Sequence, residues 1–191
     1  IPEWFIESCK KISYLFPRAH AVAYVMMAFR IAWFKVYHPL AFYAAYFSIR
    51  AKAFDLRIMT GDLKTQMTEF NRIKALDRAA SPKDKDLMSA LEVSMEMYQR
   101  GYRFINVDIQ HSEARRFSIK DGALLPPFLA IDSLCETVAD AIVAEREERP
   151  FTSLKDLQRR CKVSNTIIDL MKELKCCGEL PEDEQMSLFG A

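Results

Sequence analysis

Apolar residues crowd the amino-terminal part of the chain in a helical pattern. The pattern predicts three helices, at Pro2–Leu15, Pro17–Tyr37 and Pro39–Ala51, each beginning at a proline, as first helical positions favour. In the second of these helices, apolar side chains occur on nearly every face. A helix that is hydrophobic all round is typically buried, so we expect this one to lie at the centre of a domain.

The middle of the chain is amphipathic instead. Apolar residues recur at helical spacing over about Asp62–Ala79, which predicts a helix with one solvated face. The next helix has clear end signals, because Ser81 suits the N-cap, Asp84 follows it by three residues, and Gly101 stands where a C-terminal glycine belongs. We therefore expect a helix over Pro82–Arg100.

Strand-like alternation appears in Phe117–Leu125, on both sides of Asp121-Gly122. Such alternation about an Asp-Gly pair predicts a short β-hairpin. Pro126-Pro127 then interrupts the chain, and four short helical stretches follow in Phe128–Leu174. The predicted fold class is therefore mainly α, with one small β-hairpin.

Overall charge favours no class of partner, because 27 basic residues balance 26 acidic ones. Any contact with nucleic acid must come from a local arrangement of Lys and Arg. The apolar fraction of 50% is enough for a packed core. The cysteines show no C-x-x-C spacing, which favours reduced thiols over a metal or redox site.

The apolar run at Ala19–Ile31 contains His20 and Arg30, and Lys35 follows soon after. No uncharged stretch is long enough to cross a bilayer, so we expect no membrane partner. The sequence begins with Ile1, directly at a predicted helix start and without a signal-peptide pattern. We expect the chain to be a segment of a longer protein.

Arg18, His20 and Tyr24 form a candidate nucleotide-binding group at the start of the second helix. His20 and Tyr24 are four residues apart and so share one helix face. No capping side chain precedes the helix, so its first amides, with Arg18 beside them, suit a phosphate, and Tyr24 can stack on a base. From the residues alone, a core histidine and a core tyrosine are the simpler interpretation.

Four blocks of the amino-terminal region closely resemble the fingers of PolC-type DNA polymerase III, the bacterial C-family replicative polymerase. They are Pro2–Ile12, Phe16–Tyr24, Arg30–Lys35 and Tyr43–Phe47. The resemblance continues through the rest of the chain. It implies that the histidine and the tyrosine described above face the phosphates and the base of the incoming deoxynucleoside triphosphate, which favours the nucleotide-binding role over the core interpretation.

The resemblance also implies what this segment lacks. In the family, the acidic residues that bind Mg²⁺ lie in the palm domain, upstream of these blocks. The acidic residues that could replace those of the palm as metal ligands are Asp55, Asp62, Asp84 and Asp86. They lie on or beside amphipathic helices in no two-metal pattern, so we expect surface acids. We predict no catalytic residue and no metal ligand here, with Mg²⁺ bound elsewhere in the parent enzyme.

Two stretches, Ile131–Val143 and Ser153–Ile168, each have the shape of a helix-hairpin-helix. Such hairpins bind duplex DNA without reading its sequence, because they point backbone amides at phosphates. Glycines on both sides of a central apolar residue let the backbone approach closely. PolC relatives usually carry Gly-Leu-Gly in the first hairpin, but this chain has Ser133-Leu134-Cys135, which leaves the first hairpin's grip on phosphate in question.

The second hairpin is the better candidate for binding DNA, because Lys162, Ser164 and the basic pair Arg159-Arg160 surround its turn. Together with Leu134 of the first hairpin, these residues form the predicted DNA-binding set. A helical pair with a purely structural role is the alternative for each copy.

The sequence ends with Gln185-Met186-Ser187-Leu188-Phe189-Gly190-Ala191, after an acidic stretch. Its first five residues resemble the short peptide by which bacterial polymerases hold the sliding clamp. The resemblance implies a clamp-binding set of Gln185, Ser187, Leu188 and Phe189, in which the glutamine forms hydrogen bonds and the last two residues enter an apolar pocket. The alternative is that Leu188 and Phe189 fold back onto the helical unit.

The resulting hypothesis is a segment of a cytoplasmic replicative DNA polymerase. It comprises a fingers segment at residues 1–100, a connector with the β-hairpin at 101–125, a tandem helix-hairpin-helix duplex-binding region at 126–175 and a clamp-binding tail at 176–191. Its expected partners are the deoxynucleoside triphosphate, duplex primer–template DNA and the sliding clamp.

Two alternatives belong to other classes of protein. A free-standing helix-hairpin-helix DNA-binding adaptor would need no catalytic activity, but the second helix offers more apolar surface than one small domain needs. A helix-hairpin-helix glycosylase needs a catalytic Lys or Asp just after a glycine-bearing hairpin, and none stands near Leu134 or Val163.

Overall fold

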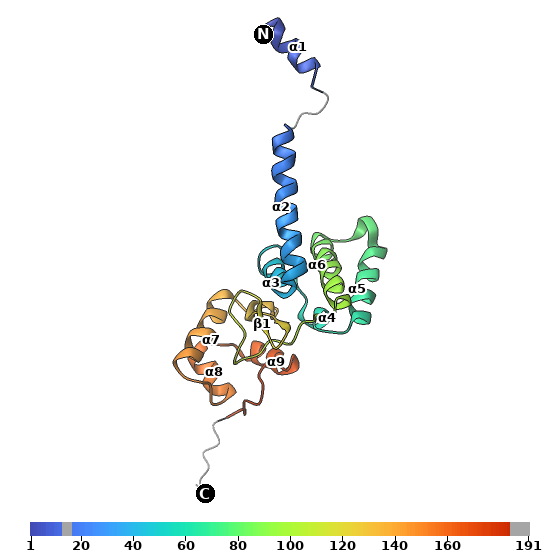
Figure 1. The fold of residues 1–191 in the computed structure, drawn as a ribbon. Coiled ribbons are helices and arrows are strands. Elements are labelled where there is room, and N and C mark those ends of the chain that lie inside the picture. The colour runs from blue at the N-terminus through green and yellow to red at the C-terminus, as the bar shows by residue number, and fades with distance from the viewer. Residues whose placement is uncertain (13–16, 184–191) are drawn as a thin grey trace, which may run out of the picture. The chain divides into compact units, whose positions relative to one another are not determined.

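The computed structural model describes residues 1–12 and 17–183. The chain divides into two compact units, Ile1–Phe42 and Tyr43–Ala191, with the boundary inside helix α3. The described elements are mostly helices, with one two-stranded sheet (Figure 1). The predicted mainly α class with one β-hairpin is therefore confirmed. The predicted division at residues 100, 125 and 175 stays a prediction.

Unit 1 contains α1 (Glu3–Lys10), α2 (Arg18–Tyr37) and the first turn of α3 (Pro39–Ile49). No side chain of α2 is buried, so the prediction of a helix buried at the centre of a domain is wrong for this chain. The physical reason is that its apolar faces have no cover among the described residues. By length and composition α2 could also cross a membrane, a property it shares with core helices of soluble proteins.

Helices α4 (Leu56–Met59), α5 (Leu63–Leu76) and α6 (Pro82–Gln99) begin at capping side chains. The Asp62 carboxylate accepts from the Thr65 amide at 2.7 Å. Ser81 and Asp84 cap each other's amides, each at 3.1 Å, which confirms the predicted start of α6. A 3₁₀ turn, η1 (Asp77–Ala79), links α5 to α6.

Four phenylalanines join α3 to the segment that follows α6. The ring centroids of Phe47 and Phe104 lie 4.9 Å apart, and those of Phe54 and Phe117 lie 5.0 Å apart, both in edge-to-face arrangements. The Phe117 amide donates to Ser48 Oγ at 2.9 Å. These contacts fix the connector against α3 within unit 2.

The predicted β-hairpin is present as β1 (Ser118–Lys120) and β2 (Ala123–Leu125), paired antiparallel with Ile119 opposite Leu124. Asp121 and Gly122 both have positive φ, at 51° and 73°, as the tight turn requires. All three residues of β2 are buried. The hairpin is therefore part of the core on one side.

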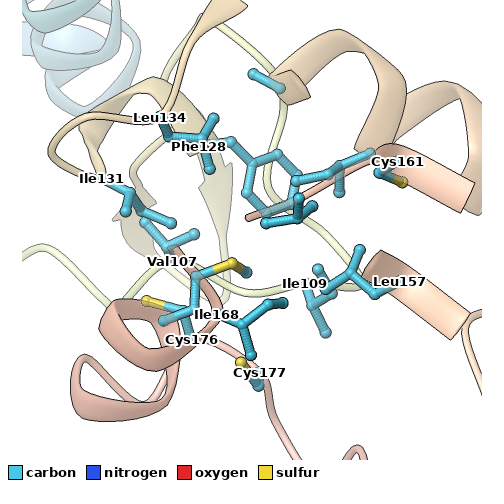
Figure 2. Close-up of a cluster of buried hydrophobic side chains, with 14 of the residues drawn as sticks. Val107, Ile109, Phe128, Ile131, Leu134, Leu157, Cys161, Ile168, Cys176 and Cys177 are labelled. Atoms are coloured by element: carbon cyan, nitrogen blue, oxygen red, sulfur yellow. The ribbon is translucent and has the colours of Figure 1, made fainter. Parts of the chain in front are cut away.

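The carboxy-terminal body consists of η2 (Phe128–Ala130), α7 (Glu136–Glu148), α8 (Leu154–Cys161) and α9 (Asn165–Glu173). Its core gathers around Phe128, Ile131 and Leu157, each at most 1% exposed, and includes three cysteines (Figure 2). Burial raises the pKa of the Cys161 thiol to about 11 and of the Cys176 thiol to about 12. These thiols therefore stay protonated and pack as small apolar groups.

Candidate nucleic-acid interface

The second hairpin is a tight turn between α8 and α9. Helix α8 ends at Cys161, and its C-cap residue, Lys162, adopts the left-handed conformation with φ 55°. Val163 is next and is only 5% exposed. Ser164 then has extended backbone, and its Oγ accepts from the Ile167 amide at 3.3 Å to cap α9. One apolar residue thus anchors the turn in the core while its neighbours on both sides are exposed.

The first hairpin repeats this geometry before α7. Ser133 is left-handed with φ 64°, and Leu134 is 6% exposed, with its amide donating to the Ile131 carbonyl at 3.2 Å. Cys135 is the N-cap of α7 and has extended backbone. Its side chain makes no capping hydrogen bond, so no side chain of the cap occupies the first amides of α7.

Both turns therefore have the same order: a left-handed residue, a buried apolar residue, and an extended N-cap residue. Glycine is the residue that usually supplies the left-handed position, and a residue with a side chain pays about 1–2 kcal/mol there. Ser133 and Lys162 adopt the conformation nonetheless. The missing glycines of the first hairpin thus leave its backbone geometry intact.

Charged side chains surround the first hairpin. Glu136 and Asp140 stand on the first turns of α7, and both pair with Arg115 from the connector, with Arg115 Nη1 lying 2.6 Å from Glu136 Oε2. The positive charge of Arg115 offsets the negative charge of the two carboxylates, which would otherwise repel a phosphate at the first amides of α7. No local pattern in the sequence indicates the role of Arg115, because the pairing joins positions more than twenty residues apart.

The predicted basic residues of the second hairpin have different surroundings. Lys162 is exposed and makes no ion pair within the part of the chain that the structure describes. The side chain of Arg159 is 70% exposed, and its Nη2 lies 2.9 Å from Asp156 Oδ1. The side chain of Arg160 is 11% exposed, donates from Nε to Glu145 Oε2 at 2.9 Å, and stacks 4.7 Å from the Phe151 ring centroid. Arg160 thus belongs to the interior of the unit.

The carboxylate of Asp156 is fully buried and holds this arrangement together. It accepts hydrogen bonds from Arg149, Arg159 and Arg160 at 2.9–3.3 Å, and from the Thr152 amide at 3.3 Å. Burial by itself would raise the pKa of Asp156, but the Thr152 amide and the guanidinium groups outweigh it and lower the pKa. A Ser-x-x-Asp pattern followed by two arginines was the available sequence clue.

The predicted nucleotide-binding group lies in unit 1. Pro17 precedes α2 and no side chain caps the helix, as predicted. The ring centroids of His20 and Tyr24 are 4.5 Å apart in an edge-to-face contact. Arg18, His20 and Tyr24 are all exposed, so neither aromatic residue is a core residue of the described chain. The structure brings the two rings together at the open end of the helix.

The predicted clamp-binding residues Gln185, Ser187, Leu188 and Phe189 lie outside the described residues. Within residues 1–12 and 17–183, no group of three or more His, Cys, Asp or Glu side chains could hold a metal ion.

Comparison with known proteins places these hairpins in a family. The model of the helix-hairpin-helix motif matches residues 101–185. DNA polymerase III PolC-type from Caldanaerobacter subterraneus subsp. tengcongensis is 48% identical over 99% of this chain. Nearly the whole chain thus matches a segment of PolC-type DNA polymerase III. PolC-type relatives from Streptococcus suis and Streptococcus pyogenes are 49% and 47% identical over the same share.

The PolC resemblance predicted from the sequence is therefore confirmed. The chain spans 13–14% of the length of these curated relatives, so most of each relative lies outside the segment compared. The matched helix-hairpin-helix region includes the connector as well as α7, α8 and α9.

The buried carboxylate gives a test of the geometry. Asp156→Asn keeps the shape but removes the charge, and we expect it to lower the free energy of unfolding by about 1.5–3 kcal/mol at pH 7, as for hydrogen bonds to charged groups. Because the folded-state pKa of Asp156 is lowered, its stabilisation is present above the unfolded pKa near 3.9 and is lost as the pH falls through the folded pKa.

Urea unfolding of wild type and variant from pH 7 to pH 3 measures this difference. The difference in free energy of unfolding between wild type and Asp156→Asn should become smaller below about pH 4. A gap that stays constant across this range would contradict the assigned role of the Asp156 charge.

Proposed function

We propose that this chain is the part of a cytoplasmic PolC-type replicative DNA polymerase that positions the incoming deoxynucleoside triphosphate, holds duplex primer–template DNA and binds the sliding clamp. The observation that carries the proposal is the shared backbone of the two hairpins, in a chain whose relatives are DNA polymerases. The alternative of a free-standing DNA-binding adaptor lacks comparable support, because the match to these polymerases covers 99% of the chain.

The hairpins hold duplex DNA through its phosphates. Amides at the start of α7 and α9, which follow the left-handed turns, donate to phosphate oxygens of the backbone, so binding is independent of sequence. At the second hairpin, Lys162 and Arg159 add positive charge and Ser164 adds a hydroxyl. Leu134 contributes by anchoring the first turn in the core. The contacts of Arg160 support a positioning role, in which it holds α8 against α7.

The triphosphate is bound at the amino-terminal end of α2. Open amides and Arg18 attract the phosphates, His20 contacts them from the same end, and Tyr24 stacks against the base. In the parent enzyme, Mg²⁺ held by acids outside this segment would stabilise the charge that develops during phosphoryl transfer. This segment contributes binding and orientation rather than the metal site.

The tail provides the clamp contact. Gln185, Ser187, Leu188 and Phe189 follow an acidic stretch that keeps the approach soluble. Burying two apolar side chains contributes about 1.5–3 kcal/mol each, less the cost of ordering the peptide. The expected affinity is about micromolar. The tail is linked to a body that is itself bound to DNA, which raises the effective concentration of the tail at the clamp. A micromolar affinity is therefore sufficient to tether the polymerase to the clamp.

Duplex binding can be tested by its dependence on salt. Lys162→Gln combined with Arg159→Gln removes two phosphate contacts, so the slope of log affinity against log salt should become shallower by roughly 2. Fluorescence anisotropy with a short labelled duplex at several salt concentrations measures the slope. Lys64→Gln with Lys85→Gln is the matched control, because it removes the same charge from exposed positions on α5 and α6. Equal slopes for the two double variants would place the DNA elsewhere.

Nucleotide binding can be tested in a full-length polymerase that carries this segment. His20→Ala should raise KM for the triphosphate, and Tyr24→Ala should weaken its use by roughly 1–3 kcal/mol through lost stacking. Tyr24→Phe retains the ring and should retain the activity. Steady-state primer extension measures these effects, with duplex affinity as the control that should not change. Loss of duplex affinity in the His20 and Tyr24 variants would argue for a structural role instead.

Clamp binding can be tested by titrating a bacterial sliding clamp into the full chain. Leu188→Ala with Phe189→Ala should abolish the interaction, because the apolar pair supplies most of the buried surface. The same variant should bind duplex DNA as tightly as the wild type. If both proteins bind the clamp equally well, the tail is not the clamp ligand.

A further inference from the structure

The acidic segment Pro181–Asp183 lies against the start of α8. The Pro181 carbonyl accepts from the Leu154 amide at 2.9 Å, and the Glu182 carbonyl accepts from the Lys155 amide at 3.2 Å. Amides in the first turn of a helix have no partner within the helix itself. The segment therefore satisfies two of these donors, which fixes its position on α8.

The side chains of this segment neutralise two lysines on the two helices of the second hairpin. Glu182 Oε1 lies 2.7 Å from Lys172 Nζ on α9, and the Asp183 carboxylate pairs with Lys155 on α8. The hydrogen bond from Lys172 lowers the pKa of Glu182, so the pair is ionised at neutral pH. One short acidic segment thus bridges α8 and α9.

Both lysines line a groove whose lining also includes residues of α8 and α9. The groove, of about 270 Å³, lies between α8 and α9 and is bordered by Lys155, Lys172 and Glu182. Its lining also includes Asn165, the first residue of α9 and the immediate neighbour of Ser164. The covered lysines therefore border the same groove as the start of α9, where phosphate is proposed to bind.

The ion pairs are easily exchanged. Lys155, Asp183 and Glu182 have side chains that are 65%, 59% and 80% exposed, and exposed ion pairs contribute little to stability. DNA offers a row of phosphates and releases condensed counterions when lysines bind it. The phosphates of a duplex bound at the hairpin can therefore displace the carboxylates of Glu182 and Asp183 from the two lysines.

We propose that Lys155 and Lys172 are further phosphate-binding residues of the second hairpin, and that Glu182 and Asp183 cover them until duplex DNA takes their place. The proposal rests on the proposed binding of duplex DNA to the hairpins and extends that site along the groove. The acidic segment then acts as a built-in competitor that weakens binding to DNA.

The test compares duplex affinity of the full chain with and without the acidic charges, by fluorescence anisotropy across a range of salt concentrations. Glu182→Gln with Asp183→Asn should tighten binding about twofold to thirtyfold at low salt. The salt slope should stay close to that of the wild type, because DNA displaces the acidic segment there too and the same two lysines contact phosphate in both complexes. Glu147→Gln with Glu148→Gln is the matched control, since it changes the net charge equally at exposed positions on α7.

A second pair of variants shows whether the effect passes through the lysines. In a chain that carries Lys155→Gln and Lys172→Gln, neutralising Glu182 and Asp183 should change affinity no more than the α7 control does. Equal tightening with and without the lysines would overturn the inference, as would an acidic-segment variant that matches the control. A wild-type chain that fails to bind duplex DNA would instead refute the proposed function itself.

Discussion

The buried carboxylate of Asp156 is the constraint on which the second hairpin depends. A charge taken out of water is costly unless it is paired and hydrogen-bonded, and here three guanidinium groups and a backbone amide supply the partners. Those partners come from α8 and from the segment between α7 and α8. The network therefore sets the direction in which α8 leaves α7. Lys162 and Ser164 receive their positions from that direction.

Features with local causes could be predicted from the sequence. The capping pair at Ser81 and Asp84, and the turn at Asp121-Gly122, depend on residues within a few positions of each other, and both appear as expected. The tandem hairpins were predicted from spacing and resemblance, and the matched motif family covers them. The positions of these elements were therefore accessible without coordinates.

The rest depends on contacts between distant residues. The sequence predicts Arg160 as a DNA-binding residue of a basic pair, yet Glu145 and Phe151 enclose its side chain, and neither is a close neighbour in sequence. The absence of glycine put the first hairpin in doubt, whereas Ser133 adopts the left-handed conformation because Leu134 anchors the turn in the core. For α2, apolar composition indicated burial, but burial also needs a covering surface, and the described chain provides none.

The hold of α8 on Pro181–Asp183 also sets a limit on reach. Leu188 lies five positions beyond Asp183, and a fully extended chain spans at most about 18 Å over that length. Under the proposed clamp binding, the contact made by Leu188 therefore lies within that distance of Asp183. If Pro181–Asp183 leaves α8 when DNA binds, its own residues add to the length of the chain between α8 and Leu188. The proposed clamp contact would thus be held close to α8 while the hairpin is free of DNA, and would have a longer reach once DNA is bound.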